Sequence, residues 1–320
     1  MLSKMLHKMS NGCEGENMWS EIGEVSNLHV YPLSSCKPMD VSEIHIGHNG
    51  VVLDESIWNN MLVVYNADSK CIYNNSAAKL SHIIVKIITS RQMELSISDF
   101  KFKLDLDILN KNELHSVVCI QLVDSKYIVK KKYIDCGDVV ANWLSHYLDE
   151  FNVRLGYVDL SAPKEIIQNY IEWMYDDSSS NQNLLNPSSC RLMSLESFEK
   201  MKENINNIDM KNFNPNIIIT TKQPFKEDQI ELFKIGDVVI KTRRLCLKFE
   251  GKKALHIPME MRMQFLSLNC ETIKSGKIKT GDKVYAILKK EKFKGPSSYE
   301  INGFVSKKYA AARKNELTKK

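Results

Sequence analysis

The chain has 320 residues, of which 43% are hydrophobic and 26% charged, and this balance indicates a globular protein with enough residues for about two domains. It contains no run of about 18 apolar residues, so we expect no membrane-spanning helix. The formal net charge is +5, but ten lysines and arginines against three glutamates fall between Lys289 and Lys320. The rest of the chain is therefore slightly negative, which argues against a nucleic-acid-binding surface on the folded body.

The cysteines indicate a reducing environment. There are eight of them, no two are spaced as C-x-x-C, and several stand in apolar runs such as "SVVCI" and "LSLNC". Scattered thiols of this kind are typical of an intracellular protein and not of a disulfide framework. We therefore expect a soluble protein of the cytoplasm or the mitochondrion. The cysteines stand at positions 13, 36, 71, 119, 136, 190, 246 and 270.

The first half of the chain reads as a series of short strands. Residues 1–26 have a broken apolar pattern and are expected to form a flexible lead. "LHVYPLSSCKPM" (28–39) predicts a strand and a turn, and "MLVVYNADSKCIY" (61–73) predicts a hairpin. "FKFKLDLDI" (100–108) alternates apolar and charged residues, as half-buried antiparallel strands do. Many strands without long helices between them predict a barrel or sandwich.

The periodicity then becomes helical. In "DCGDVVANWLSHYLDEF" (135–151) apolar residues recur at intervals of one and four, which predicts an amphipathic helix. A second helix is predicted over 161–177, with Pro163 in its first turn, and a third after Ser194 as N-cap. Residues 176–189 are of low complexity and predict a loop, and strands resume after residue 212.

The order of these segments resembles that of the MOSC-domain proteins. The resemblance is carried, in order, by "VYPLSSCK", "DCGDVVANWLSHYL", "NFNPNIIIT", "IGDVVIKTRRLC" and "GKIKTGDKVYAI". It runs from about Leu28 to Leu288 and is closest to the amidoxime-reducing components and the C-terminal region of molybdenum cofactor sulfurases. The resemblance implies an α+β, β-rich fold with two β-barrel-like domains and peripheral helices. The implied domains are a MOSC N-terminal barrel over 27–160 and a MOSC domain over 161–295, followed by a basic tail over 296–320.

The resemblance also implies a cofactor, a pterin that carries molybdenum and a phosphate. A thiolate suits the metal, and cations and hydrogen-bond donors suit the phosphate. In the family these come from a Lys-Ser pair, an arginine on the next hairpin, an arginine before a Pro-Asn dipeptide and a cysteine after an Ile-Gly-Asp strand. The positions that match here, and therefore the expected cofactor-binding residues, are Ser34, Ser35, Asn60, Asn214 and Asn216. Ser194 is a further candidate.

These positions depart from the family pattern, because three cations are replaced by uncharged residues. Each lost contact from arginine or lysine to phosphate removes about 1.5–3 kcal/mol, so the loss would weaken binding about a thousandfold or more. Arg243 and Arg244 could restore one or two cations. The ligand cysteine aligns without gaps at Phe249, three residues after Cys246. Cys246 becomes the metal ligand if the loop is shortened here.

Two functions from different classes follow. One is a molybdenum-dependent oxidoreductase that reduces N-hydroxylated substrates with electrons from a cytochrome b5-like partner. The other is a repurposed MOSC-fold binding or assembly protein without molybdenum, whose basic tail contacts an acidic partner. Neither reading identifies a catalytic residue. His45 and His48 ("HIGH") are expected to be surface residues and Cys136 a packing residue.

Overall fold

The computed structural model describes residues 19–47, 50–53, 57–73, 78–107, 116–123, 127–158, 165–168, 190–203, 208–243 and 267–288. Within these ranges no helix is both long and apolar enough to cross a membrane.

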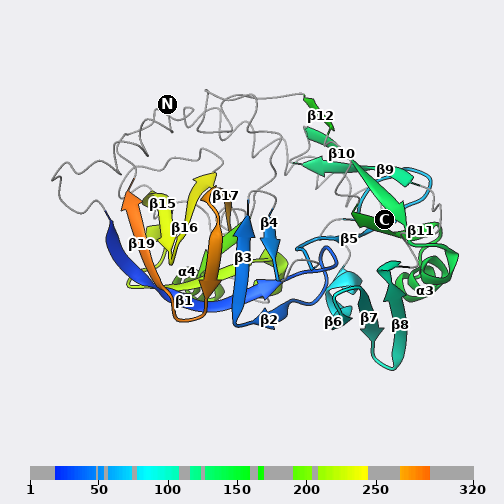
Figure 1. The fold of residues 1–320 in the computed structure, drawn as a ribbon, viewed down its shortest axis with the longest axis horizontal. Helices are drawn as coiled ribbons and strands as arrows, with labels where there is room; N and C mark the ends of the chain where they lie inside the picture. Colours follow the sequence, from blue (N-terminus) through cyan, green and yellow to red (C-terminus); the bar gives the residue numbers. More distant parts are fainter. Residues whose placement is uncertain are drawn as a thin grey trace, which may run out of the picture.

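A closed ring of seven strands forms one half of the molecule and lies to the left in Figure 1. Its strands bring the start of the chain together with its second half, because β1 pairs with β14 on one side and with β19 on the other. The ring runs in the order β1 (Ser20–Val30), β14 (Ile217–Thr221), β13 (Cys190–Ser194), β17 (Leu268–Lys274), β16 (Val238–Arg243), β15 (Ile230–Ile235) and β19 (Lys283–Leu288).

The ring forms because alternate residues of each strand are apolar and fill its interior. In β13, for example, Cys190 and Leu192 are buried in the same cluster as Leu268 and Cys270 of β17. The tight turn between β15 and β16 uses Gly236, whose φ of 55° is one that glycine adopts without strain. Smaller elements border the ring: β2 (Met39–Val41), β3 (Glu43–Gly47), β4 (Gly50–Val52), β18 (Gly276–Lys279), α4 (Leu195–Lys202), and the 3-10 turns Met210–Phe213 and Lys226–Gln229.

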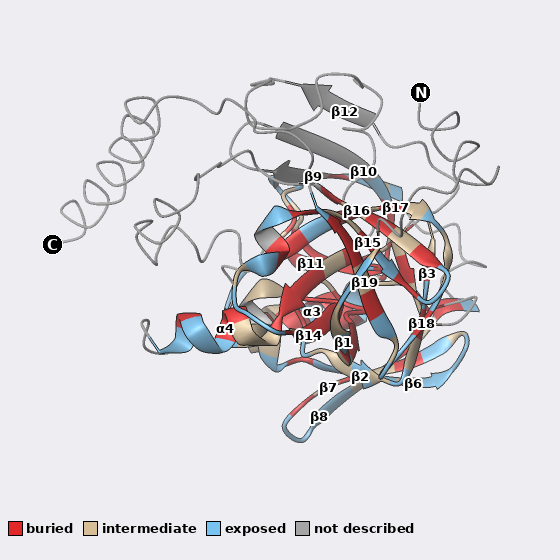
Figure 2. Cartoon of the chain, turned by 90° about the vertical axis from the view of Figure 1, so that its left-hand side faces the viewer, coloured by how far each residue is buried: buried red, intermediate tan, exposed pale blue. Residues whose placement is uncertain are grey.

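A second group of sheets holds the other core, to the right in Figure 1. One sheet contains β5 (Leu62–Asn66), β9 (Ser116–Val123), β10 (Tyr127–Asp135), β11 (Val153–Val158) and β12 (Glu165–Gln168). The other contains β6 (Ile84–Thr89), β7 (Gln92–Ile97) and β8 (Phe100–Asp105), after a 3-10 turn at Ala78–His82. The helix α3 (Asp138–Leu148) buries its apolar face in this core, whereas the β7–β8 hairpin projects from the body in Figure 2.

The β-rich fold with few helices is confirmed, as are the hairpin that begins with β5 and the helix α3. The pairings among the described residues close one ring of strands and not two. Two predictions are wrong. Residues 20–26 are not a flexible lead, because they pair with β14 and β19 as the first part of β1. The helix predicted over 161–177 is not formed at Glu165–Gln168, which pair with β10 as β12.

Candidate functional site at the rim of the barrel

The end of β1 meets the start of β5 at one rim of the ring. The backbone N–H of Asn60 donates to the carbonyl of Tyr31 at 2.7 Å, and the N–H of Leu62 donates to that of Pro32 at 2.9 Å. The Tyr31 N–H donates to the side-chain oxygen of Asn59 at 2.9 Å. The chain therefore passes from the ring to the second group of sheets along a hydrogen-bonded path.

Asn216, at the start of β14, ties this path to the ring. Its side chain is 1% exposed, and its amide group donates to the carbonyl of His29 at 3.1 Å and to the side-chain oxygen of Asn59 at 3.0 Å. Its own side-chain oxygen accepts from the N–H of Arg191 at 3.1 Å. The hydroxyl of Tyr31 donates to the adjacent carbonyl of Pro215 at 3.2 Å. We call these residues, His29, Tyr31, Asn59, Arg191, Pro215 and Asn216, the rim junction.

His29 brings an unsatisfied buried atom to the junction. Its Nε2 lies 3.0 Å from a carboxylate oxygen of Asp40, its register partner in β2. Among the described residues its Nδ1 has no hydrogen-bond partner. Burial lowers the pKa of His29, although Asp40 and the Pro215 carbonyl act in the opposite direction. His29 is therefore neutral near pH 7, since its pKa lies below the ordinary value of 6.5.

Two arginines share a row across the strands next to the junction. Arg191 in β13 is paired with Asn269 in β17, and Asn269 is paired in turn with Arg243 in β16. The guanidinium of Arg191 donates to the carbonyl of Phe213 at 3.2 Å and lowers the pKa of Tyr31, which burial raises strongly. Arg191 thus brings positive charge to this rim, and a guanidinium group suits planar or anionic ligands.

Those residues expected to bind a cofactor that the structure describes lie near the junction, except Ser194. Ser34 follows β1, and its backbone N–H donates to the carbonyl of Leu62. Ser35, Asn60 and Asn214 have positive φ angles of 66°, 59° and 46°. The backbone of Arg243 is linked to that of Arg191 through their shared register partner, Asn269. Arg244, Cys246 and Phe249 lie outside the described residues, as does His48.

Ser194 is the exception, because it belongs to the N-terminus of α4. Its hydroxyl accepts from the N–H of Ser197 at 3.3 Å and lies 2.9 Å from the hydroxyl of Thr221. The N-cap prediction is therefore confirmed. Cys136 is a buried packing residue, and burial raises the pKa of its thiol. His45 lies in β3 and, like the other described residues, belongs to no cluster of three metal-ligating side chains.

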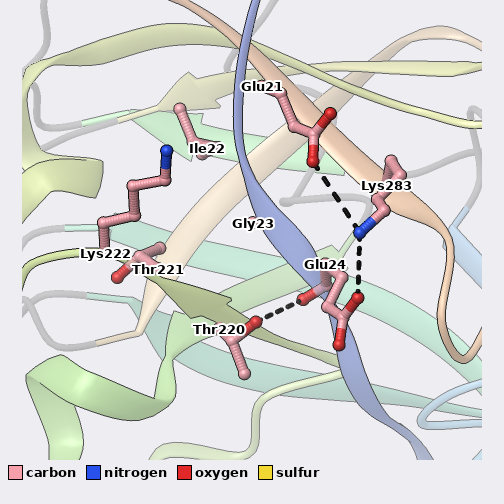
Figure 3. A pocket seen from close by; sticks show the side chains of 8 residues that line it. All are labelled: Glu21, Ile22, Gly23, Glu24, Thr220, Thr221, Lys222 and Lys283. Atoms are coloured by element: carbon pink, nitrogen blue, oxygen red, sulfur yellow. Dashed lines mark hydrogen bonds and ion pairs between the residues drawn. The ribbon is translucent and has the colours of Figure 1, made fainter.

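A surface hollow lies at the other end of β14, where β1 crosses it (Figure 3). Its charges neutralise one another, because the ammonium of Lys283 lies 3.2 Å from Glu24 and 3.7 Å from Glu21. Backbone atoms fill much of the crossing, since a Cβ on Gly23 would lie 1.7 Å from the carbonyl oxygen of Thr220. This hollow is therefore a weaker candidate for a ligand site than the rim junction.

Five junction residues were not predicted as site residues, namely His29, Tyr31, Asn59, Arg191 and Pro215, the last of which lies between the candidates Asn214 and Asn216. Tyr31 stands in the quoted segment "VYPLSSCK", and Asn59 directly precedes the candidate Asn60, so proximity in sequence was a usable signal for these two. His29 and Arg191 reach the junction only through strand pairing, which a single sequence does not reveal.

Comparisons with known proteins relate the first half of the chain to a known domain family. Residues 22–150 match the family model of the MOSC N-terminal beta barrel domain. This part of the chain is a MOSC N-terminal domain. The predicted resemblance to MOSC-domain proteins is thereby confirmed, and the matched residues include most of β1 and the β1–β5 path.

The curated relatives of this chain have names linked to molybdenum. It is 25% identical over 236 residues to mitochondrial amidoxime reducing component 2 of Rattus norvegicus, a match that covers 71% of this chain and 65% of the relative. It is 26% identical over 242 residues to mitochondrial amidoxime-reducing component 1 of Homo sapiens, covering 71% and 64%. A match to molybdenum cofactor sulfurase of Drosophila mojavensis has 25% identity over 227 residues and covers 68% and 26%. The matches thus span less than two thirds of each relative's length.

The described residues fit the anionic part of a molybdenum pterin only in part. Within the described part of the chain, the hydroxyl of Ser34 and the side chain of Asn60 form no hydrogen bond, and Arg191 adds charge. The amide of Asn216 and the hydroxyl of Ser194 are already engaged by protein groups. The candidate metal ligand, Cys246, falls outside the described ranges.

Proposed function

We propose that this MOSC protein is a molybdenum-cofactor oxidoreductase of the amidoxime-reducing type that works at the rim junction. The observation that carries the proposal is the convergence of segments around Asn216. Ser34, Asn60 and Asn214 come from three separate parts of the sequence, and all lie beside the same hydrogen-bonded path. The names of the relatives, which refer to amidoxime reduction and to the molybdenum cofactor, give this site its proposed ligand.

In this proposal the residues of the chain bind and orient the cofactor. Ser34 and Asn60 donate hydrogen bonds to it, and Arg191 and Arg243 neutralise its phosphate. The thiolate of Cys246 is the proposed metal ligand, because a soft anion suits molybdenum. When bound, the cofactor supplies two electrons for removal of the oxygen from an N-hydroxylated substrate. The buried frame of Asn216 and Tyr31 holds the two sides of the junction together.

The proposed partner is a cytochrome b5-like electron donor, and the proposed compartment is the cytoplasm or the mitochondrion. The names of the amidoxime-reducing relatives include "mitochondrial" and so favour the latter. The basic residues between Lys289 and Lys320 are the proposed contact for an acidic partner surface, whose attraction would weaken as salt is added.

A second candidate is a MOSC-type binding or assembly protein without molybdenum. It is favoured by the engagement of Asn216 and Ser194 in hydrogen bonds within the protein, which leaves few donors for a phosphate. It is also favoured by Ser34 and Ser35, which stand where the family has a Lys-Ser pair.

Elemental analysis of the chain purified from its own host separates the two candidates. The oxidoreductase predicts molybdenum near one atom per chain, lost in Cys246→Ser and kept in Cys71→Ser, a control at a half-buried cysteine of the other group of sheets. A folded wild-type chain without molybdenum would overturn the first candidate and support the second.

A further inference from the structure

We propose that Cys190 and Cys270 are a thiol pair that closes to a disulfide across two strands inside the barrel. The proposal goes beyond the function suggested above and does not depend on it. It rests on the pairing of β13 with β17, which places the two cysteines directly opposite each other. Neither cysteine forms a disulfide in the structure.

The ladder gives the pair suitable geometry. β13 and β17 are antiparallel, with Cys190 opposite Cys270 and Leu192 opposite Leu268. Opposite residues of an antiparallel pair have Cα atoms about 4.5–5.5 Å apart, and disulfides form over about 4.4–6.8 Å. The spacing of the two Cα atoms expected from the register therefore suits a disulfide.

The two side chains also share one face of the sheet. Cys190 and Cys270 are 2% and 0% exposed and belong to the apolar cluster inside the ring, whereas Asn269, one residue along β17, is exposed. The thiols therefore point into the same interior. By contrast Cys119, which is equally buried, is paired in register with Lys131 and has no cysteine opposite it.

The bond forms by a two-electron oxidation, for which we name a peroxide as oxidant. Hydrogen peroxide accepts the two electrons and both thiol protons, an S–S bond forms between Cys190 and Cys270, and two water molecules leave. The attacking form is the thiolate, which burial in apolar surroundings disfavours. Closure should therefore be slow, and a thiol reductant should reverse it after the barrel opens locally.

Closure would affect the rim junction, since the pair lies one residue from it. Arg191 follows Cys190 and accepts a hydrogen bond from the N–H of Asn216 at 2.8 Å. Asn269 precedes Cys270 and is the register partner of both arginines in the row. A covalent link between β13 and β17 would thus fix the spacing of the strands that carry this side of the junction.

The test is a disulfide map of the reduced full-length chain after treatment with hydrogen peroxide. We expect the intact mass to fall by two hydrogen atoms and a non-reduced digest to contain the Cys190 peptide joined to the Cys270 peptide. Because the bond closes a long loop, we expect the midpoint of thermal unfolding to rise by roughly 10 °C, an increase that a reductant removes.

Matched variants sharpen the result. Cys190→Ala and Cys270→Ala should each abolish the joined peptide and the rise in midpoint, whereas Cys119→Ala should keep both. The disulfide map of the peroxide-treated wild-type chain tests the proposal even if a variant fails to fold. Joined peptides that involve other cysteines, oxidation of Cys190 to a sulfinic acid without a link, or reduced thiols throughout in a chain that stays folded would each overturn the proposal.

Discussion

At the scale of single residues, Asn216 shows how one polar side chain can join two groups of sheets. All of its side-chain hydrogen-bonding groups are used, and they reach β1, β13 and the segment before β5. Buried amides are tolerated when they are satisfied in this way, and removing one partner leaves the others unpaired.

Asn216→Ala should therefore lower the free energy of unfolding by about 2–4 kcal/mol. The reason is that the N–H of Arg191 and the carbonyl of His29 lose their partner in a buried place. Urea unfolding followed by circular dichroism measures the change. Asn269→Ala, at an exposed position in β17, should change stability by less than about 0.5 kcal/mol. Equal effects of the two substitutions would contradict the role given to Asn216.

Asp135 plays a comparable part in the second group of sheets. Burial raises the pKa of its carboxyl, but hydrogen bonds from Arg154, Tyr65 and the N–H of Gly137 outweigh burial and lower the pKa below 3.8. A carboxylate with a lowered pKa stabilises the fold fully above its unfolded-state pKa and loses that effect as pH falls through the folded-state pKa.

We accordingly expect the stability that Asp135 contributes to be intact above about pH 4 and to disappear at more acidic pH. Asp135→Asn should lower the free energy of unfolding at pH 7 by about 3–5 kcal/mol, since Arg154 loses its main buried partner. Unfolding at several pH values measures both effects, with Asp107→Asn as an exposed control that pairs with Arg91. A variant that kept the wild-type loss of stability in acid would show that other carboxyls cause it.

At the scale of elements, the crossing of β1 and β14 depends on Gly23. Two irregularities in the register of β1 lie on either side of it, between Glu21 and Gly23 and between Val25 and Asn27. There the backbone of β14 approaches too closely for any side chain at position 23.

Gly23→Ala should displace β1 from β14 and lower the thermal unfolding midpoint by roughly 5 °C or more. The reason is the 1.7 Å approach of the added Cβ to the Thr220 carbonyl oxygen. Gly47→Ala is the matched control, because its Cβ would have no neighbour nearer than 3.8 Å. Similar midpoints for both variants would show that the crossing can relax without cost.

Elements with a strong local signal could be predicted from the sequence, and elements set by distant partners could not. The pattern of α3 and the cap of α4 by Ser194 are local, and both are confirmed. β12 has the apolar spacing of a helix but pairs with β10, so a tertiary contact overrides the local preference. The same limit applies to the junction, because Ser34 and Asn60 were reached through family motifs, whereas His29 and Arg191 depend on register.

At the scale of the whole molecule, β1 completes the ring by pairing with both β14 and β19. The strand comes from the beginning of the chain and its two neighbours from the second half. The ring is thus a single unit in which neither half of the sequence forms a closed barrel without the other.

Deletion of residues 1–26 should therefore open the ring and prevent cooperative unfolding, because β19 would lose all of its pairing with β1 and β14 would lose the pairs made by Gly23, Glu24 and Val25. Deletion of residues 1–18 is the control, since it leaves every strand of the ring complete. Circular dichroism during thermal unfolding, with size-exclusion chromatography for aggregation, distinguishes the two. A monomeric chain that unfolds cooperatively without residues 1–26 would contradict this account.

The pairing of β1 with β19 also determines when the ring can close during translation. β1 leaves the ribosome long before its partner β19, which begins at Lys283. Until then the hydrogen-bonding groups of β1 that pair with β19 have no permanent neighbour, and contacts so distant in sequence form slowly. The nascent chain must therefore carry an unpaired strand edge while the intervening residues are translated, and chaperones that bind extended segments are suited to shield it.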